Sequence, residues 1–311
     1  MMLPDLAELI ALRGVAQGLA LAPHRRAREL TTGGHESAHR GRGLEFQEVR
    51  QYVAGDDPRT IDWRVTARRG RPHTKLFREE RERPVWLLVD LNPSLYFGTR
   101  RQLKSVAIVR AAALLAWIAA LGGDRVGAVI AGGTGHRVLP PRSRDAAVLP
   151  LLAALHELQP RAPGRVSGPS LAPALDSLAS LARSGSVVLA LSDFAGLAEA
   201  SEEGWSALAG RAECRLYWVV DPLEEQALPN GSFRAGVPGR VRLLDGARVR
   251  ARWLDSWRRR EARVRALARF LGAPVTKLDT AEPVEEVLAW ELKPRAGIRR
   301  SSARTSREVR A

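Results

Sequence analysis

Short apolar runs that alternate with helical segments are the feature that most constrains the fold of this chain. Val85–Leu91 (VWLLVDL) is a continuous apolar run, which is typical of a strand buried on both faces. A long helix rich in Ala and Leu is expected at 101–121, followed by a second strand at Arg125–Ala131. Further strands are expected at 187–191, 214–220 and 275–278. This alternation predicts an α/β fold with a mainly parallel central sheet and helices on both faces.

The remaining expected elements are antiparallel strands and helices. An antiparallel strand at 136–139 should pair with 125–131 through a Gly-rich turn, and strands at 241–244 and 249–252 should form a hairpin through Asp245-Gly246. Helices are expected at 4–22, 143–158, 171–183, 202–210, 253–271 and 283–290.

Nothing in the sequence favours secretion or a membrane span. The N-terminus has no basic region before its short apolar stretch. Arg110 interrupts the most apolar segment, 105–121, and about 20 apolar residues are needed to span a bilayer. The single cysteine, Cys214, excludes an internal disulfide and falls in an apolar strand, where it should serve packing. We therefore expect a soluble, cytoplasmic protein.

The net charge of +15 is concentrated in three segments. These are the stretches 13–42, 248–269 and 293–311, of which the last is a tail that should be disordered. A solvated helix face is one interpretation of the arginines at 248–269, and an acidic protein, nucleic acid or anionic lipid partner is the other. Specific nucleic-acid recognition is not indicated, because no reading helix or aromatic platform is evident. Peripheral contact with a membrane remains open.

Oxygen-bearing side chains follow two of the buried strands. Asp90, Asn92 and Ser94 come at the end of the first strand, and Asp193 follows the strand at 187–191. Ser170 precedes a predicted helix. Ligands of parallel α/β sheets bind beyond the carboxyl ends of the strands, and a hard cation such as Mg²⁺ prefers oxygen ligands. The alternative is that these residues only cap helices and form turns.

Three segments carry a family resemblance. The stretch GRGLEFQEVRQYVAGDDPRTIDW (Gly41–Trp63), together with VWLLVDLNPSLYFGTRRQLKS and GDRVG (Gly123–Gly127), resembles the domain-of-unknown-function 58 (DUF 58) family. The resemblance runs from about residue 35 to 290 and implies a family-specific N-terminal segment joined to a von Willebrand factor A (vWA)-type domain. We therefore divide the chain into an N-terminal segment (1–83), a vWA-like domain (84–292) and the basic tail.

The resemblance also implies a metal-ion-dependent adhesion site that binds Mg²⁺. Asp90 and Ser94 match its pattern, Asn92 stands where a serine is expected, Ser170 where a threonine is expected, and Asp193 on the second aspartate. A turn held by hydrogen bonds, without metal, is the alternative. A MoxR-type AAA+ ATPase is the partner that the resemblance implies.

The GDDPRTIDW segment offers a second candidate surface. Asp56, Asp57, Arg59 and Asp62 bring both signs of charge together around a turn. They could form a docking surface for a partner, or they could be salt-bridged within the fold. The nearby His35-Glu36-Ser37-Ala38-His39 fits the zinc-protease pattern by letter, but surrounding glycines disfavour the helix that this chemistry needs.

These features favour a non-enzymatic interaction protein that works with a MoxR-type ATPase. No phosphate-binding loop, nucleophile elbow or dinucleotide fingerprint is present. A basic protein that binds nucleic acid or a membrane surface is the second hypothesis, and a metal-dependent hydrolase is the third.

Overall fold

The computed structural model describes residues 3–21, 44–53, 58, 61–79, 83–133, 135–162, 171–196, 202–237 and 240–292. The chain forms two compact units, one made of 1–23 with 84–311 and the other of 24–83. Each unit is described separately below.

A six-stranded sheet forms the centre of the larger unit. Its strands are β3 (Pro84–Asp90), β4 (Arg125–Gly132), β5 (Gly135–Ser143), β6 (Ser186–Ser192), β7 (Ala212–Val220) and β10 (Val275–Asp279). The strand order is β10-β7-β6-β3-β4-β5, and every pair is parallel except β4 with β5. The chain therefore winds outward in one direction from β3 and then in the other from β6. This is the doubly wound order, whose reversal point lies between β3 and β6.

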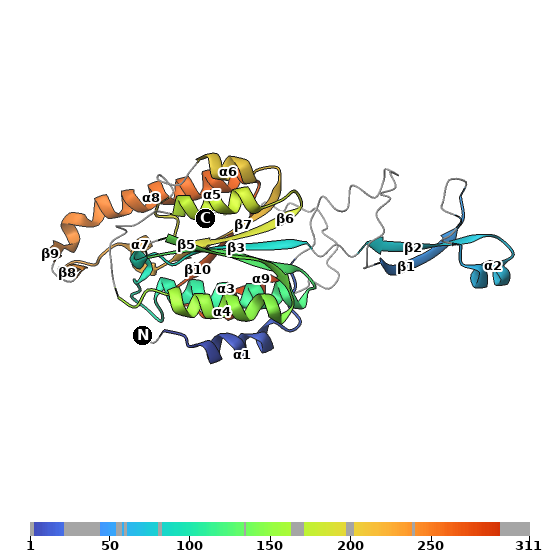
Figure 1. Ribbon diagram of the computed structural model, residues 1–311. Coiled ribbons are helices and arrows are strands. Elements are labelled where there is room, and N and C mark those ends of the chain that lie inside the picture. Colours follow the sequence, from blue (N-terminus) through green and yellow to red (C-terminus); the bar gives the residue numbers. More distant parts are fainter. Residues whose placement is uncertain are drawn as a thin grey trace, which may run out of the picture. The chain divides into compact units, whose positions relative to one another are not determined.

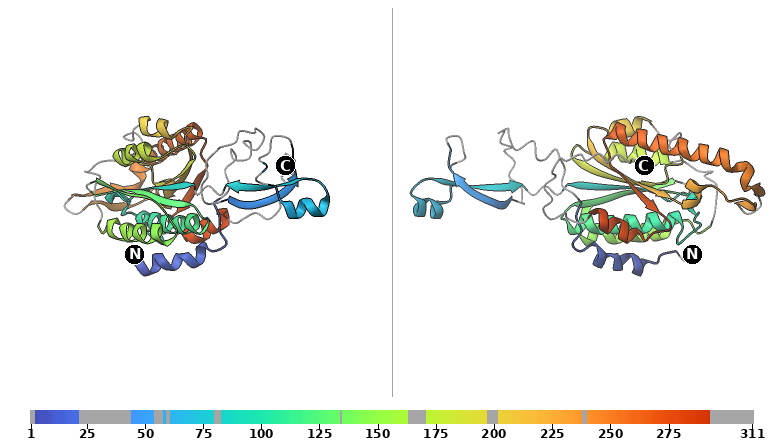
Figure 2. Two further views of the ribbon diagram at one scale, coloured as in Figure 1. Left: turned by 45° about the vertical axis from the view of Figure 1, so that its right-hand side comes forward. Right: turned by 180° about the vertical axis from the view of Figure 1, so that it is seen from behind.

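Helices cover both faces of this sheet (Figure 1). On one face lie α3 (Lys104–Leu121), α4 (Asp145–Leu158) and α9 (Val284–Leu292), and on the other lie α5 (Leu171–Leu181), α6 (Glu202–Leu208) and α8 (Gly246–Leu271). The reverse view in Figure 2 shows the same layers. The predicted α/β class, with a mostly parallel sheet between helices, is confirmed.

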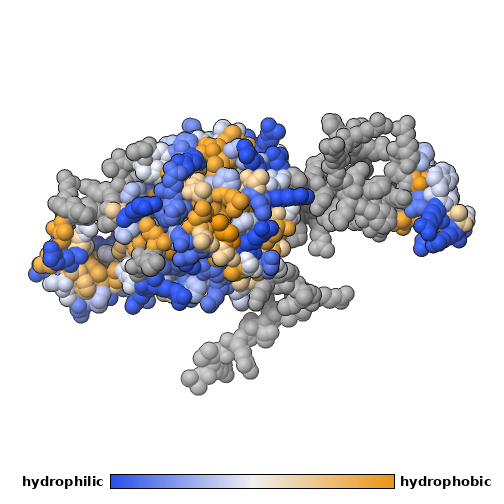
Figure 3. Space-filling model, turned by 60° about the horizontal axis from the view of Figure 1, so that its bottom comes forward, coloured by the Kyte–Doolittle hydropathy of each residue, from blue (hydrophilic) through white to orange (hydrophobic). Residues whose placement is uncertain are grey.

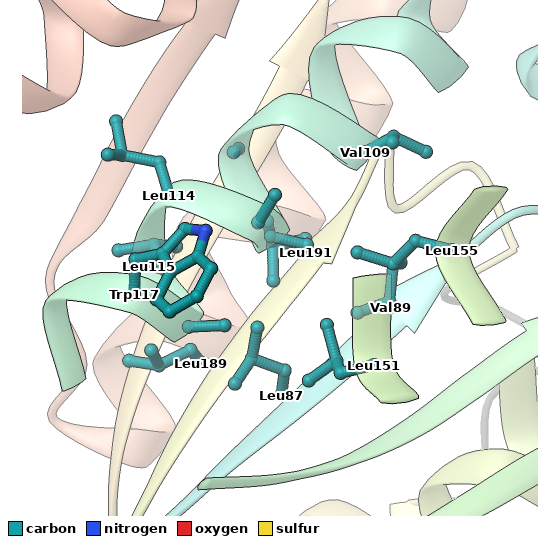
Figure 4. Packing of buried hydrophobic residues seen from close by; sticks show 14 of the residues in the cluster. Leu87, Val89, Val109, Leu114, Leu115, Trp117, Leu151, Leu155, Leu189 and Leu191 are labelled. Carbon is teal, nitrogen blue, oxygen red and sulfur yellow. The ribbon is translucent and has the colours of Figure 1, made fainter. Parts of the chain in front are cut away.

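The larger core packs β3 and β6 against α3 and α4. Leu87 and Val89 of β3 and Leu189 of β6 are buried, and they point toward α3 and α4 (Figure 4). Within the described residues, α3 is the one helix long and apolar enough to cross a membrane, and 89% of that stretch is buried inside the fold. Its apolar character is therefore explained by packing, as the sequence predicted for this segment.

The first helix, α1 (Leu6–Ala16), forms an additional layer on α3 and α4 (Figure 1). Asp5 caps it by accepting a hydrogen bond from the Glu8 N–H at 2.8 Å. Leu9 faces inward, and its carbonyl accepts a hydrogen bond from Trp117 Nε1 of α3 at 3.1 Å. The observed division assigns α1 to the same unit as residues 84–311, whereas the sequence analysis grouped it with the rest of 1–83.

Apolar side chains are also exposed on this layer. Figure 3, with the lower side of Figure 1 turned forward, shows hydrophobic surface between hydrophilic residues. Leu6, Ile10 and Val15 of α1 and Leu149 of α4 are all partly exposed.

The hairpin predicted at Asp245-Gly246 is wrong. Strand β9 (Arg240–Asp245) pairs antiparallel with β8 (Ser232–Val237), and α8 begins at Gly246. The Asp245 carboxylate accepts hydrogen bonds from the N–H groups of Ala247 and Arg248 at 2.9 and 3.2 Å. An aspartate followed by glycine suits a helix cap as well as a tight turn, and the cap prevails because the following residues form an amphipathic helix on the core.

The smaller unit is built on a two-stranded antiparallel sheet. Strand β1 (Leu44–Gln51) pairs with β2 (His73–Glu79), with an irregularity in register between Phe46 and Glu48. Between them lies α2 (Trp63–Arg69), which ends at Gly70 in the left-handed conformation with φ of 68°. The basic linker at 22–43, the histidines at 35 and 39, and the tail at 293–311 lie outside the described residues.

Candidate functional site

Most of the predicted metal ligands lie at the reversal point of the sheet. Asp90 ends β3 and Asp193 directly follows β6, which is its parallel neighbour. Asn92 and Ser94 lie in the segment after β3, where Pro93–Leu95 form a single 3-10 turn. The structure therefore brings four of the five residues to one edge, and Ser170 lies outside the described residues.

Asp90 is fully engaged in hydrogen bonds. Its Oδ1 accepts from the Asn92 N–H at 3.1 Å and from Asn92 Nδ2 at 2.7 Å, and its Oδ2 accepts from Ser192 Oγ at 2.7 Å. Burial, followed by the negative charge of Asp193, raises the pKa of Asp90 to about 6. The two carboxylates therefore influence one another, as expected for groups at a shared edge.

A strained turn positions Asp193. The next residue, Phe194, is buried and has a φ of 52°, a left-handed conformation that costs a bulky residue about 1 to 2 kcal/mol. The Phe194 N–H donates to Ser192 Oγ at 2.9 Å, and the Ala195 N–H donates to Asp193 Oδ1 at 2.9 Å. Trp218 Nε1 donates to the Asp193 carbonyl at 3.1 Å. The surrounding structure thus determines the direction of this carboxylate.

A buried lysine occupies the space beside Asp193. Lys104 is the first residue of α3, and its Nζ lies 2.9 Å from Asp193 Oδ2 and 2.7 Å from Glu224 Oε1. Its side chain is only 3% exposed. Burial alone would lower the pKa of Lys104, but the charges of Asp193 and Glu224 raise it above its usual value. Burial alone would raise the pKa of Asp193, but the positive charges of Lys104 and then of Arg260 have the larger effect and lower that pKa.

Helices α7 and α8 complete the surroundings of this ion pair. Glu224 lies in α7 (Pro222–Gln226), where it forms a capping box with Asp221. Its Oε1 also lies 2.7 Å from Arg260 Nη1 of α8. Trp257 stacks on Trp218 of β7, with ring centroids 5.0 Å apart and nearly parallel planes.

A cleft of about 390 Å³ opens over this cluster. Its charged groups come from four separate segments of the chain, and three aromatic rings stand around them. The lining residues are Ser94, Phe97, Lys104, Asp193, Ala195, Glu224, Trp253, Ser256, Trp257 and Arg260. Only Ser94 and Asp193 among them were predicted from the sequence. The signal that could have identified Lys104 is its place at the start of an almost wholly apolar helix, where the helix dipole disfavours a cation.

These residues do not fit a Mg²⁺ ion. The carboxylate oxygens of Asp90 and Asp193 all accept hydrogen bonds from protein donors, and Asp193 also pairs with an ammonium group. Two unit charges about 4 Å apart repel by about 4 kcal/mol at an effective dielectric constant of about 20, and a divalent ion doubles that. Within the described part of the chain, no group of three or more acidic, histidine or cysteine side chains could hold a metal.

The second candidate surface is described at one residue. Asp62 caps α2 by accepting hydrogen bonds from the N–H groups of Arg64 and Val65 at 3.0 and 3.1 Å. Asp56, Asp57 and Arg59 lie outside the described residues.

Cys214 is buried, and burial followed by the charge of Glu213 raises its pKa to about 12. Its thiol therefore stays protonated and uncharged within the apolar core.

Solved structures with a similar arrangement have low sequence identity. A conserved hypothetical protein BatB from Bacteroides thetaiotaomicron is 15% identical, with a TM-score of 0.44 over 67% of this chain and 96% of that one. An aerotolerance-related membrane protein from Bacteroides fragilis is 15% identical, with a TM-score of 0.43 over 68% and 98%. A von Willebrand factor type A protein from Catenulispora acidiphila is 14% identical, with a TM-score of 0.38 over 70% and 43%.

Sequence relatives are more similar. Uncharacterized proteins of Mycobacterium bovis and Mycobacterium tuberculosis are 36% identical over 224 residues, which cover 68% of this chain and 68% of each relative. The model of the family described as "Protein of unknown function DUF58" matches residues 48–269. This chain belongs to the DUF58 family.

Proposed function

We propose that this chain is a non-enzymatic interaction protein whose vWA-like unit binds an acidic segment of a protein partner in the cleft at the sheet edge. The proposed partner is a MoxR-type AAA+ ATPase, in keeping with the family resemblance, and the proposed location is the cytoplasm. The observation that carries this proposal is the composition of the cleft.

The cleft combines aromatic walls with a prearranged charged floor. Phe97, Trp253 and Trp257 line it, and Trp253 is held by hydrogen bonds from its Nε1 to the carbonyls of Leu223 and Glu224, both at 3.1 Å. Tryptophan and arginine are enriched among the residues that dominate protein–protein binding energy. Rigid aromatic side chains also lose little conformational entropy when a partner binds.

Arg260 supplies the preference for an acidic group. Its side chain is 25% exposed, so it is accessible from the cleft while the floor beneath it is buried. Arg260 donates to Glu224 through Nη1, whereas a guanidinium has five N–H donors in all. A partner carboxylate can therefore pair with Arg260 without breaking the Lys104 cluster.

A binding assay with matched arginine variants tests this proposal. The full chain and the MoxR-type ATPase of the same genome would be purified, and their affinity measured by biolayer interferometry. We expect Arg260→Glu to weaken binding at least about tenfold, corresponding to about 1.4 kcal/mol. Arg259→Glu is the control, because Arg259 is one residue away on α8, is 67% exposed and pairs only with Asp255 among described residues. Equal affinity of both variants and the wild type would refute the role of the cleft.

The arginines of α8 favour a second candidate, binding to nucleic acid or a membrane surface. Arg248 is 88% exposed, and Arg252 and Arg258 lie exposed without an ion pair among the described residues. Duplex DNA and anionic vesicles would be compared in the same instrument. Binding to either that falls steeply with salt and is unchanged by Arg260→Glu would favour this second function.

A further inference from the structure

The position of Lys104 has a consequence for how the cleft is assembled. Its ammonium lies within hydrogen-bond distance of two carboxylates that come from different elements, Asp193 after β6 and Glu224 of α7. The Phe97 ring closes another side, with its centroid 5.8 Å from Nζ. The Lys104 side chain therefore links the sheet edge to α7 through hydrogen bonds to one carboxylate of each.

The charges balance among the four groups that contact one another at Lys104. Lys104 and Arg260 provide two positive charges, and Asp193 and Glu224 provide two negative charges within the same set of contacts. Asp90 is not part of this set of contacts, and its oxygens accept from Asn92 and Ser192. A buried carboxylate without a partner is costly, and here every one has a protein donor.

The position of Lys104 in α3 also indicates that its charge is needed for the two ion pairs and not for the helix. Lys104 occupies the first turn of α3, where the helix dipole disfavours positive charge, and the rest of the helix is almost wholly apolar. Packing and dipole would both favour an apolar residue there. The two carboxylates are the feature that stabilises a lysine at this position.

We propose that the Lys104 ammonium supplies, at Asp193, the positive charge that the divalent cation implied by the family resemblance would supply, so that the cleft forms without a metal ion. Lys104 is thus a positioning residue that holds Asp193 and Glu224 together and leaves Arg260 free to face a ligand. This inference goes beyond the proposed function, because it concerns the assembly of the site, and its test uses no partner.

The test compares the metal response of two lysine variants of the full chain. Thermal unfolding and isothermal titration with MgCl₂ would be measured for the wild type, Lys104→Met and Lys277→Met. Lys277 is the control, because it also lies near two carboxylates, those of Glu225 and Asp279, but it is 40% exposed and outside the cleft. Methionine keeps the length of the side chain and removes its charge.

We expect the wild type to give no heat of Mg²⁺ binding and the same midpoint in EDTA as in millimolar MgCl₂. Lys104→Met should unfold at a lower temperature in EDTA and recover part of the loss in MgCl₂, whereas Lys277→Met should match the wild type in both. The double variant Lys104→Met/Asp193→Asn should be less destabilised than Lys104→Met and should not respond to MgCl₂.

Two results would overturn the inference. One is saturable Mg²⁺ binding to the wild type that Asp193→Asn abolishes. The other is a Lys104→Met variant as stable as the Lys277→Met control. If Lys104→Met does not fold, the wild-type titration and the double variant still test the inference. A double variant that also fails to fold contradicts the charge-balance explanation. None of these results bears on whether the ATPase binds.

Discussion

Asp221 joins three segments of the chain near the cleft. This buried carboxylate ends the run of β7 and accepts hydrogen bonds from the Thr99 N–H at 2.7 Å, Thr99 Oγ1 at 2.5 Å, Thr280 Oγ1 at 2.6 Å and the Leu223 N–H at 3.0 Å. Hydrogen bonds to a charged group each contribute about 1.5 to 3 kcal/mol. We therefore expect Asp221→Asn to lower the free energy of unfolding by about 3 kcal/mol in urea denaturation at pH 7. An equal loss in Asp255→Asn, at an exposed position of α8, would contradict this explanation.

Asp221 should also make the stability of the fold depend on pH. Burial raises the pKa of Asp221, but hydrogen bonds from Thr280 and Thr99 outweigh burial and lower that pKa below its usual value. Because the folded-state pKa is lower, its stabilisation is complete above the unfolded-state pKa of about 3.9 and is lost as the pH falls through the folded-state pKa. The stability difference between wild type and Asp221→Asn should thus be constant from pH 7 to about pH 5 and shrink only in stronger acid. A difference that shrinks near pH 6 would point to another group.

At the scale of elements, two helical glycines should respond in opposite ways to the same substitution. Gly14 of α1 is exposed, with nothing within 4 Å of an added Cβ, so Gly14→Ala should raise the free energy of unfolding by about 1 kcal/mol through helix propensity. Gly246 begins α8, and an added Cβ would clash with the carbonyl of Pro229, which cannot move independently of the backbone. Gly246→Ala should therefore lower the free energy of unfolding by at least about 2 kcal/mol. Urea denaturation measures both, and two changes of the same sign would contradict the packing at Gly246.

Apolar composition predicted the elements whose burial is uniform. The run at Val85–Leu91 and the helix after it are apolar because both are enclosed, so composition alone identifies them. The segment after Asp221 was harder, because Asp245-Gly246 is compatible with a turn and with a cap. That choice depends on the packing of α8 against the sheet, which a local pattern does not contain.

The candidate site divides in the same way. Asp90 and Asp193 could be brought together from sequence, because parallel neighbouring strands place their carboxyl ends at one edge. Lys104 could not, since it is 89 residues from Asp193 and 120 residues from Glu224, and their meeting depends on where α3 and α7 begin. Charge alone did not distinguish this buried lysine from the many exposed cations.

For the whole molecule, the division into units predicts how truncations behave. The α/β unit includes residues 1–23, because α1 buries Leu9 and Leu12 against its core and Glu8 pairs with Arg110 of α3 at 2.8 Å. A chain that begins at residue 84 lacks these contacts and leaves Trp117 without its acceptor. A chain in which a Gly/Ser linker replaces 24–83 keeps them all, and linker length changes the loop-closure free energy only slightly.

We expect the linker chain to unfold in urea within about 1 kcal/mol of the α/β transition in the full protein. The chain starting at residue 84 should be less stable by at least about 4 kcal/mol, because two buried leucines contribute about 2 kcal/mol each and their partners on α3 become exposed. Leu9→Ala in the full chain should account for about 3 kcal/mol of this loss. Comparable stability of the two shortened chains would mean that α1 adds little to this unit, and the expected boundary at residue 84 would then describe the folding unit better than the observed one.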